Sequence, residues 1–119
     1  MHALIIEDES LIAILIEDSL RDCGFTSFDL ATSCEAAIRF ASRRCPNLIT
    51  ADVELKPGSG IDAVDAICSG PPIPVVFVTG SPGAVVQRKP HHLLLVKPFE
   101  TGKLIAIVKL ALAGADKAR

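Results

Sequence analysis

Short apolar runs alternate with segments of helical periodicity along most of this chain. Apolar runs of this length, separated by helical patterns, are typical of parallel strands that are buried on both faces. The predicted strands are residues 3–7, 27–31, 48–52, 74–79 and 92–96. Helices are predicted at about residues 10–23, 61–68, 84–88 and 100–113, with one more between the second and third strands. Five strand–helix units in this order predict an α/β fold, a doubly wound parallel sheet with right-handed crossovers.

Several helix ends carry recognisable signals. Gly24 stands where a glycine commonly follows a helix. Residues 32–35, Thr-Ser-Cys-Glu, resemble a capping box that opens the second helix, and Pro46 ends that helix near Arg44. The tail from Gly114 to Arg119 is expected to fray.

Four of the apolar runs end in residues that can do chemistry. The first run ends in the acidic stretch Glu-Asp-Glu at 7–9, the third in Asp52, the fourth in Thr79 and the fifth in Lys97. In an open parallel sheet, ligands bind outside the carboxyl ends of the strands. Carboxylates, a hydroxyl and an amine from distant parts of the chain are therefore expected to converge at one edge.

The chemistry of this group indicates phosphoryl transfer to a carboxylate. Packed carboxylates raise one another's pKa values, and Mg²⁺ relieves that cost by binding their oxygens, often together with a phosphate. Asp52 would be the nucleophile, while Thr79 and Lys97 would bind the phosphoryl oxygens. The alternative for the stretch 7–9 alone is a solvated acidic turn at the start of a helix, which suits the helix dipole. Asp52 favours the functional interpretation, because a buried strand has no structural use for an acid at its end.

Composition narrows the class of protein. The chain has 119 residues, half of them hydrophobic, which predicts one domain spanning 1–119 with a substantial core. A net charge of −2 gives no reason to expect binding to nucleic acid or to a membrane surface. No apolar run approaches the roughly 18 residues of a membrane span, and the start does not resemble a signal peptide, so a cytoplasmic location is expected. The cysteines lack metal-ligand or disulfide spacing and are expected to be partly buried, reduced thiols: Cys23, Cys34, Cys45 and Cys68.

In combination, the motifs resemble the receiver domain of two-component response regulators, over essentially the whole chain. They are Ile-Ile-Glu-Asp-Glu at 5–9, Asp52 with Gly60 eight residues later, Val-Thr-Gly at 78–80, and Lys-Pro-Phe at 97–99. The stretches at 4–9, 51–55 and 60–64 are most similar to receivers of the alphaproteobacterial general stress response. Phe-Val-Thr-Gly-Ser at 77–81 also resembles the single-domain "FATGUY" receivers of that pathway.

The resemblance implies a (βα)5 flavodoxin-like fold with strand order 2-1-3-4-5. It implies that Asp52 accepts phosphate from a phosphohistidine on a histidine kinase or phosphotransferase, and that Thr79 and Lys97 contact the phosphoryl group. The implied Mg²⁺ ligands are Glu7 through water, Asp8, Asp52 and the backbone carbonyl of Glu54. It also implies a cis peptide bond before Pro98 and no enzymatic activity beyond self-phosphorylation and autodephosphorylation.

The chain also departs from the pattern of many receivers. Lys56 stands where many have proline, and Pro82 stands at the tyrosine of the FATGUY motif. Leu94 replaces the aromatic residue whose rotamer reports phosphorylation, so an aromatic-switch readout is not indicated. Glu54 adds an acid two residues beyond Asp52, and it would either favour Mg²⁺ or hinder attack of water on the aspartyl phosphate.

Helical periodicity predicts which residues face outward. In the first helix, the stripe that faces the sheet is Ile12, Leu15, Ile16 and Leu20. Leu11 and Ile14 then lie outside, as do Ile105 and Leu112 on the last helix. These are either ordinary exposed aliphatics or docking faces. By resemblance, the first helix receives the kinase, and the 80–113 face forms a homodimer or binds an effector protein.

Two alternative functions remain at this stage. One is a pseudo-receiver that keeps the fold and interacts without phosphorylation. The other is a metal-dependent hydrolase, although no clear general acid lies beside Asp52 in the sequence. No effector domain fits within 119 residues, so DNA binding by this chain is not expected unless the sequence is part of a longer protein.

Overall fold

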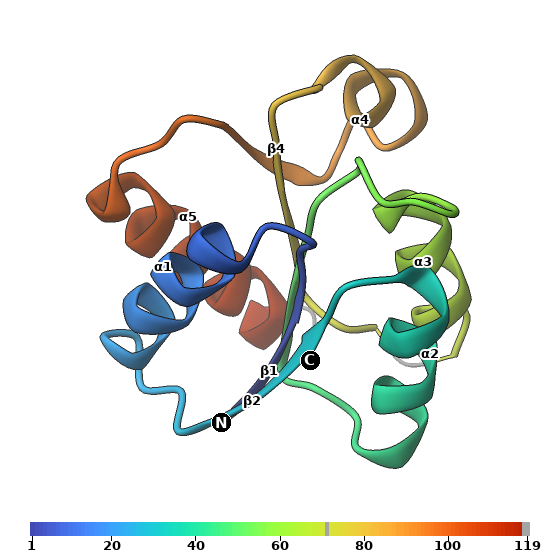
Figure 1. Ribbon diagram of the computed structural model, residues 1–119. Coiled ribbons are helices and arrows are strands. Elements are labelled where there is room, and N and C mark those ends of the chain that lie inside the picture. The colour runs from blue at the N-terminus through green and yellow to red at the C-terminus, as the bar shows by residue number, and fades with distance from the viewer. Residues whose placement is uncertain (71, 118–119) are drawn as a thin grey trace.

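The computed structural model describes residues 1–70 and 72–117 and contains a five-stranded parallel sheet (Figure 1). The strands are β1 (His2–Ile6), β2 (Ser27–Ala31), β3 (Leu48–Ala51), β4 (Val75–Thr79) and β5 (Leu93–Val96). The helices are α1 (Ser10–Arg21), α2 (Cys34–Arg43), α3 (Gly60–Ile67), α4 (Gly83–Arg88) and α5 (Thr101–Lys117). The strand order β2-β1-β3-β4-β5 confirms the predicted doubly wound α/β fold. None of the described helices is long and apolar enough to cross a membrane.

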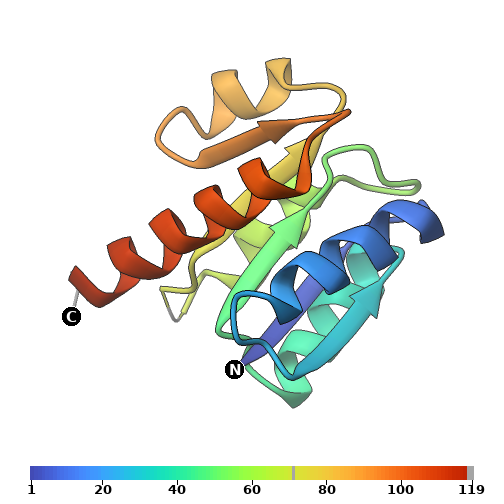
Figure 2. The same ribbon diagram turned by 90° about the vertical axis from the view of Figure 1, so that its left-hand side faces the viewer.

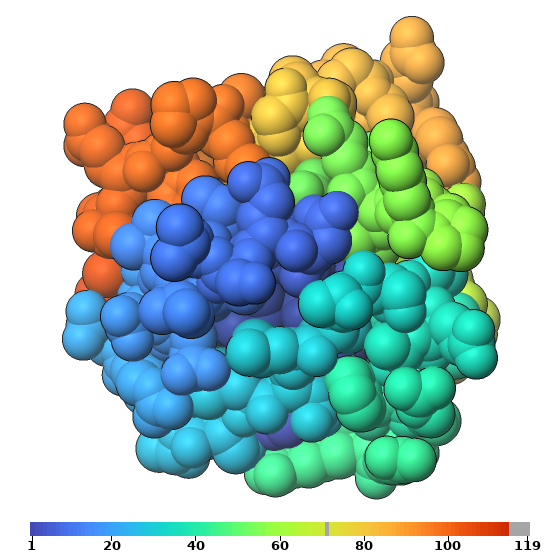
Figure 3. Space-filling view, in the orientation of Figure 1, coloured from blue at the N-terminus to red at the C-terminus, as the bar shows by residue number. Residues whose placement is uncertain are grey.

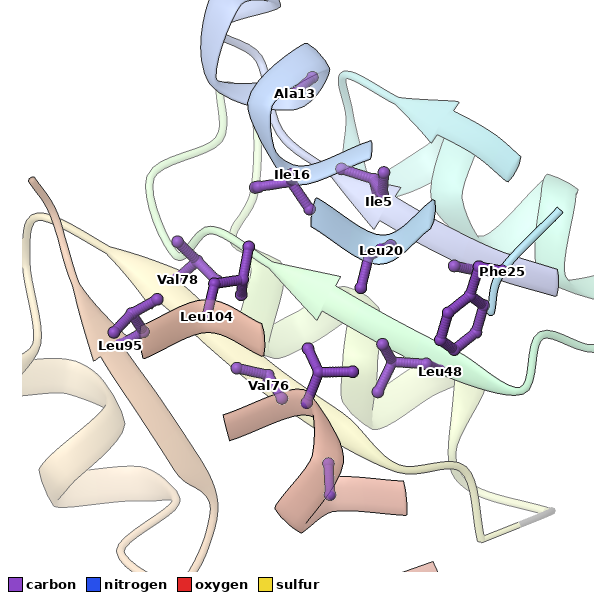
Figure 4. Packing of buried hydrophobic residues seen from close by; sticks show 13 residues of the cluster. Ile5, Ala13, Ile16, Leu20, Phe25, Leu48, Val76, Val78, Leu95 and Leu104 are labelled. Atoms are coloured by element: carbon purple, nitrogen blue, oxygen red, sulfur yellow. The ribbon is translucent and has the colours of Figure 1, made fainter. Parts of the chain in front are cut away.

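Helices cover both faces of the sheet, which is why the central strands β1, β3 and β4 are buried and mostly apolar, whereas the edge strand β2 is mixed. Figures 1 and 2 show α1 and α5 side by side on one face, and α2 and α3 on the other. Successive residues of β1 alternate between these faces: Ile5 packs with Ile16 and Leu104 in the first core, while Leu4 packs in the second core with Ile61. Figure 4 shows the first core, where strand and helix side chains interdigitate.

The helix ends follow the predicted signals with small shifts. Gly24 has φ +93°, and its N–H donates to Arg21 while that of Phe25 donates to Leu20, the bonds of a Schellman motif. The first helix therefore ends at Arg21 rather than Cys23. The N-cap of α2 is Ser33, whose hydroxyl accepts a hydrogen bond from the N–H of Ala36. The N-cap thus lies one residue after the start of the capping box predicted at 32–35, and that prediction is wrong.

Two predictions about the last helix are wrong. α5 continues to Lys117 instead of ending at Ala113, since a glycine at 114 costs a helix only about 1 kcal/mol. Residues 118 and 119 of the predicted tail lie outside the described residues. Leu112 is partly buried against the first core, one turn beyond Val108, and the exposed leucine is Leu110.

The cysteines are unpaired, as predicted, but only three of the four are partly buried. Cys45, after α2, is exposed. The sulfurs of Cys23 and Cys68 have raised pKa values, primarily because burial disfavours the thiolate. These thiols are therefore small packing groups rather than activated nucleophiles.

Gly60, the first residue of α3, packs directly against the backbone of Asp52. A Cβ at this position would lie 1.9 Å from the Asp52 carbonyl oxygen, which leaves no room for any side chain. We expect Gly60→Ala to lower the free energy of unfolding by about 2–4 kcal/mol, because α3 or the end of β3 must move. Urea denaturation measures this. Gly102→Ala is the matched control, since a Cβ there meets nothing within 4 Å. Equal effects of the two substitutions would contradict the close packing of Gly60 against the backbone of Asp52.

Candidate functional site

Backbone hydrogen bonds align the ends of β1 with β3 and of β4 with β5 at one edge of the sheet. The N–H of Asp52 donates to the carbonyl of Ile6, and the N–H of Lys97 donates to that of Thr79, each at 2.9 Å. All four strands run parallel, so the residues that end or follow them meet there (Figure 1). The convergence that the sequence predicts is therefore present.

Lys97 lies at the centre of an acidic cluster. Its Nζ is 2.6 Å from Glu7 Oε1, 2.9 Å from Asp52 Oδ2 and 3.4 Å from Glu9 Oε1. Glu7 and Asp52 are each only 3% exposed, whereas Glu9 is largely exposed. One ammonium thus compensates two buried carboxylates that would otherwise lie unpaired. The sequence did not single out Glu9 as a partner of Lys97, because in the sequence it is one more acid at the start of a helix.

Burial and pairing shift the pKa values at this centre. Burial raises the pKa of Glu7 to about 7, an effect that exceeds the opposing hydrogen bond from Lys97. Burial alone would lower the pKa of Lys97, but its contacts with Glu7 and Asp52 outweigh that effect and raise it. Lys97 is therefore charged at neutral pH, while Glu7 is poised between its two forms.

The raised pKa of Glu7 predicts a specific pH dependence of stability in the absence of divalent metal. The folded state retains a proton up to about pH 7, whereas the unfolded chain releases it near 4.5. The wild type should therefore lose stability relative to Glu7→Gln as the pH rises between these values. Urea denaturation of both proteins in EDTA measures the difference. A wild type that keeps its stability relative to Glu7→Gln, or gains stability relative to it, as the pH rises would contradict the burial of an ionisable Glu7.

A second set of contacts joins the loops after β3 and β4. The backbone N–H of Glu54 donates to Asp52 Oδ1, and that of Ser81 donates to Thr79 Oγ1, both at 3.1 Å. The Ser81 hydroxyl also donates to Glu54 Oε1. Thr79 is fully buried. The sequence marks Glu54 as an additional acid and Ser81 as the last residue of the motif at 77–81, but it does not indicate the contact between them.

The departures from the receiver pattern have definite places in the fold. Leu94, in β5, is partly buried against the second core. The peptide bond between Lys97 and Pro98 is cis, as the resemblance implies, and so is the bond between Lys56 and Pro57. Proline thus lies one residue later in the β3–α3 loop than in many receivers.

The donor set fits a hard divalent cation. Carboxylate oxygens of Glu7, Asp8, Glu9 and Asp52 lie within 4.8 Å of one another. All are oxygen donors, the ligands that Mg²⁺ prefers, and Asp8 is exposed, so it is open to the solvent from which a hydrated ion arrives. Four acids and one ammonium leave an excess of negative charge when all are ionised, and a divalent cation would offset it.

Comparison with known proteins identifies the family. The family model described as "Response regulator receiver domain" matches residues 3–109. The phyllosphere-induced regulator PhyR of Methylorubrum extorquens is 35% identical over 98% of this chain and 45% of its own length. The transcriptional regulatory protein PdtaR of Mycobacterium tuberculosis is 33% identical over 94% of this chain and 57% of its own. The chain thus spans about half the length of these relatives.

Solved structures agree. The receiver domain of PhyR from Erythrobacter litoralis superposes with a TM-score of 0.85 at 32% identity, covering 93% of this chain and 88% of that one. PhyR from Brucella abortus gives 0.88 at 32% identity, covering 98% of this chain and 49% of that one. The chain belongs to the response regulator receiver domain family and is a signalling domain of two-component systems, not a catalytic enzyme.

Proposed function

We propose that this receiver domain accepts a phosphoryl group on Asp52 from a phosphohistidine of a histidine kinase or a phosphotransferase. The observation that carries the proposal is the setting of the Asp52 carboxylate. One of its oxygens is held by Lys97 Nζ, the other by the N–H of Glu54, and the side chain lies at the strand ends inside the acidic cluster. Such fixed geometry favours attack on a phosphorus atom, since positioning and charge stabilisation dominate phosphoryl transfer.

We infer that Mg²⁺ binds beside Asp52. Asp8, Asp52 and the backbone carbonyl of Glu54 would bind the ion directly, and Glu7 would act through water. When bound, the ion neutralises charge between the carboxylates and the phosphoryl oxygens. Ionisation of Glu7 is then favoured, because the cation offsets the burial that raises its pKa.

In the transfer step, an Asp52 oxygen forms a bond to phosphorus, and the bond from phosphorus to the donor nitrogen breaks with its electron pair leaving on the imidazole. Lys97, freed from part of its contact with Asp52, binds one phosphoryl oxygen through its ammonium. The Thr79 hydroxyl binds another. Its oxygen already accepts from Ser81 N–H, so its own proton is available to donate.

Small phosphodonors test this function without the cognate kinase. The wild type, incubated with acetyl phosphate and Mg²⁺, should gain the mass of one phosphoryl group, and EDTA should prevent the gain. With Mg²⁺, beryllofluoride should shift the amide resonances of residues at the strand ends. A protein that stays unmodified and unshifted would instead be a pseudo-receiver. Sustained turnover of phosphate esters would support a hydrolase.

The family and the similarity to PhyR indicate which proteins this chain works with. As a receiver domain, the chain works with a histidine kinase. We propose that it acts in the cytoplasm and signals by protein–protein contacts in a stress pathway, as the similarity to PhyR suggests; one relative is described as an anti-anti-sigma factor. We also propose that the chain has a single-domain, FATGUY-like role, and that it passes its signal on through the 80–113 face.

Helix α1 offers the surface for the phosphodonor protein. Leu11 is 82% exposed and Ile14 54% exposed, on the outer side of the helix that begins beside the acidic cluster. Replacing both by serine should slow transfer from the cognate phosphohistidine protein about tenfold or more, because apolar anchors dominate such contacts. Phosphorylation by acetyl phosphate should not change. Val86→Ser, an exposed valine on α4, is the matched control. Unchanged transfer from the kinase would rule out this docking face.

A further inference from the structure

Two cysteines lie at neighbouring helix ends, at the edge of the sheet opposite the acidic cluster. The helices α2 and α3 pack against each other, and both run from the cluster edge of the sheet to the opposite edge, since each connects two parallel strands (Figure 1). Cys45 follows the end of α2 by two residues, and Cys68 directly follows α3. In Figure 3, the blue-green surface of the α2 segment adjoins the green surface of the α3 segment at the right of the view. The fold therefore brings together two thiols that are far apart in the sequence.

A groove separates the two helix ends. It has a volume of about 250 Å³ and is lined by Cys45 on the α2 side and by Ile67, the residue before Cys68, on the α3 side. Beyond the groove, the segments that follow both cysteines enter paired strands, where the N–H of Ile49 donates to the carbonyl of Pro74 at 2.9 Å. Packed helices on one side and paired strands on the other thus hold these two helix ends next to each other.

The two thiols differ in exposure, and one acts on the other. Cys45 is exposed, and its Sγ makes a weak hydrogen bond to the carbonyl of Pro46 at 3.8 Å, whereas Cys68 is partly buried against the second core. Burial raises the pKa of Cys68, and the acidic neighbours Asp65 and Cys45 raise it further. The pair therefore combines one accessible thiol with one sheltered thiol nearby.

We infer that Cys45 and Cys68 form an oxidisable pair, whose substrate is a peroxide and whose product is a disulfide that joins the ends of α2 and α3. Cys45 reacts first, because exposure favours oxidation. A disulfide requires that the two Cα atoms lie within about 7 Å of each other. The backbone has already left the helix and is extended at Arg44, so a small movement of this connecting segment can bring Cys45 to its partner.

The reaction has two steps. The Cys45 thiolate attacks one oxygen of hydrogen peroxide, the O–O bond breaks, and the departing hydroxide takes up the proton that Cys45 released, which gives water and a sulfenic acid. The Cys68 sulfur then releases its proton and attacks the Cys45 sulfur, and the S–O bond breaks with the loss of a second water. Two electrons pass from the thiols to the peroxide. Cys68 does not have to be an activated nucleophile, because the sulfenic acid sulfur is a strong electrophile.

Two other uses of this pair are less favoured. A structural Zn²⁺ needs four ligands, and among the residues that the structure describes, the possible metal ligands that gather closely are those of the acidic cluster. Packing alone would explain a buried cysteine, but Cys45 is exposed. In a reducing compartment, an accessible disulfide of this kind is transient and responds to oxidants.

Intact-mass measurement of the wild type tests the pair. A small excess of hydrogen peroxide should remove two hydrogen masses from the monomer, and dithiothreitol should restore them. Peptide mapping without reduction should find Cys45 joined to Cys68. Cys68→Ser should stop at the sulfenic acid, which dimedone traps on Cys45, and Cys45→Ser should form no disulfide. Cys23→Ser is the matched control, because Cys23 is also partly buried but packs against the first core, so this variant should form the disulfide as fast as the wild type.

Three results would overturn the inference. They are a wild type that keeps all four thiols under these conditions, a disulfide that joins another pair, and a disulfide through Cys45 between two copies of the chain, which non-reducing electrophoresis reveals. Cys68→Ala replaces Cys68→Ser if serine disturbs folding at this partly buried position, and the peptide map of the wild type decides without either variant. No phosphodonor is used, so the outcome is independent of the function proposed above.

Discussion

Asp52→Asn is expected to abolish phosphorylation by acetyl phosphate in the presence of Mg²⁺. The amide has nearly the same shape, and its single oxygen can still accept from Lys97 or from Glu54 N–H, but it is not a nucleophile. No other carboxylate of the cluster has the same setting. Glu7 is buried in contact with Lys97, and Asp8 and Glu9 are exposed. The variant should therefore show no phosphoryl adduct by mass spectrometry under conditions that modify the wild type.

The control for this experiment is an acid outside the site. Asp18→Asn, at an exposed position of α1, should be phosphorylated as efficiently as the wild type. Circular dichroism should show that Asp52→Asn remains folded, since it leaves the packing of β3 unchanged. An adduct on Asp52→Asn at the wild-type rate would show that another residue is the acceptor, and peptide mapping would locate it.

Lys97→Met is expected to cause the second large effect, a loss of about 3 kcal/mol in the free energy of unfolding at neutral pH in EDTA. Methionine preserves much of the side-chain volume but removes the charge that compensates Glu7 and Asp52, whose side chains are 1% and 4% exposed. Two buried carboxylates without a cation must either remain ionised at high cost or bind a proton.

Two changes of condition identify the cause of that loss. The destabilisation should shrink as the pH falls below about 7, where Glu7 is protonated and needs no cation. Mg²⁺ should also recover part of it, because the ion supplies the missing positive charge. Lys89→Met is the matched control: Lys89 pairs with the half-exposed Asp65, and its loss should cost less than about 1 kcal/mol. Equal losses for the two lysines would show that the charge balance at the strand ends is unimportant.

Particular residues show how much of the fold and of the site can be predicted from the sequence. Val76 and Val78 face the first core and Phe77 the second, so the apolar run of β4 predicts a strand buried on both faces. The same reasoning puts Asp52 and Lys97 at one edge, because parallel strands end on the same side. Leu112 was assigned to the wrong face because a helical stripe is wide, and its packing depends on what lies opposite.

Local periodicity and the direction of parallel strands are enough to predict the order of strands and helices, the edge at which the functional groups gather, and the kinds of groups found there. How far each group is buried, and which atoms it contacts, depends on tertiary packing. The raised pKa of Glu7, the inclusion of Glu9 and the bond between Ser81 and Glu54 all belong to this second class. Each depends on distances of a few ångströms between segments far apart in the chain, which periodicity does not encode.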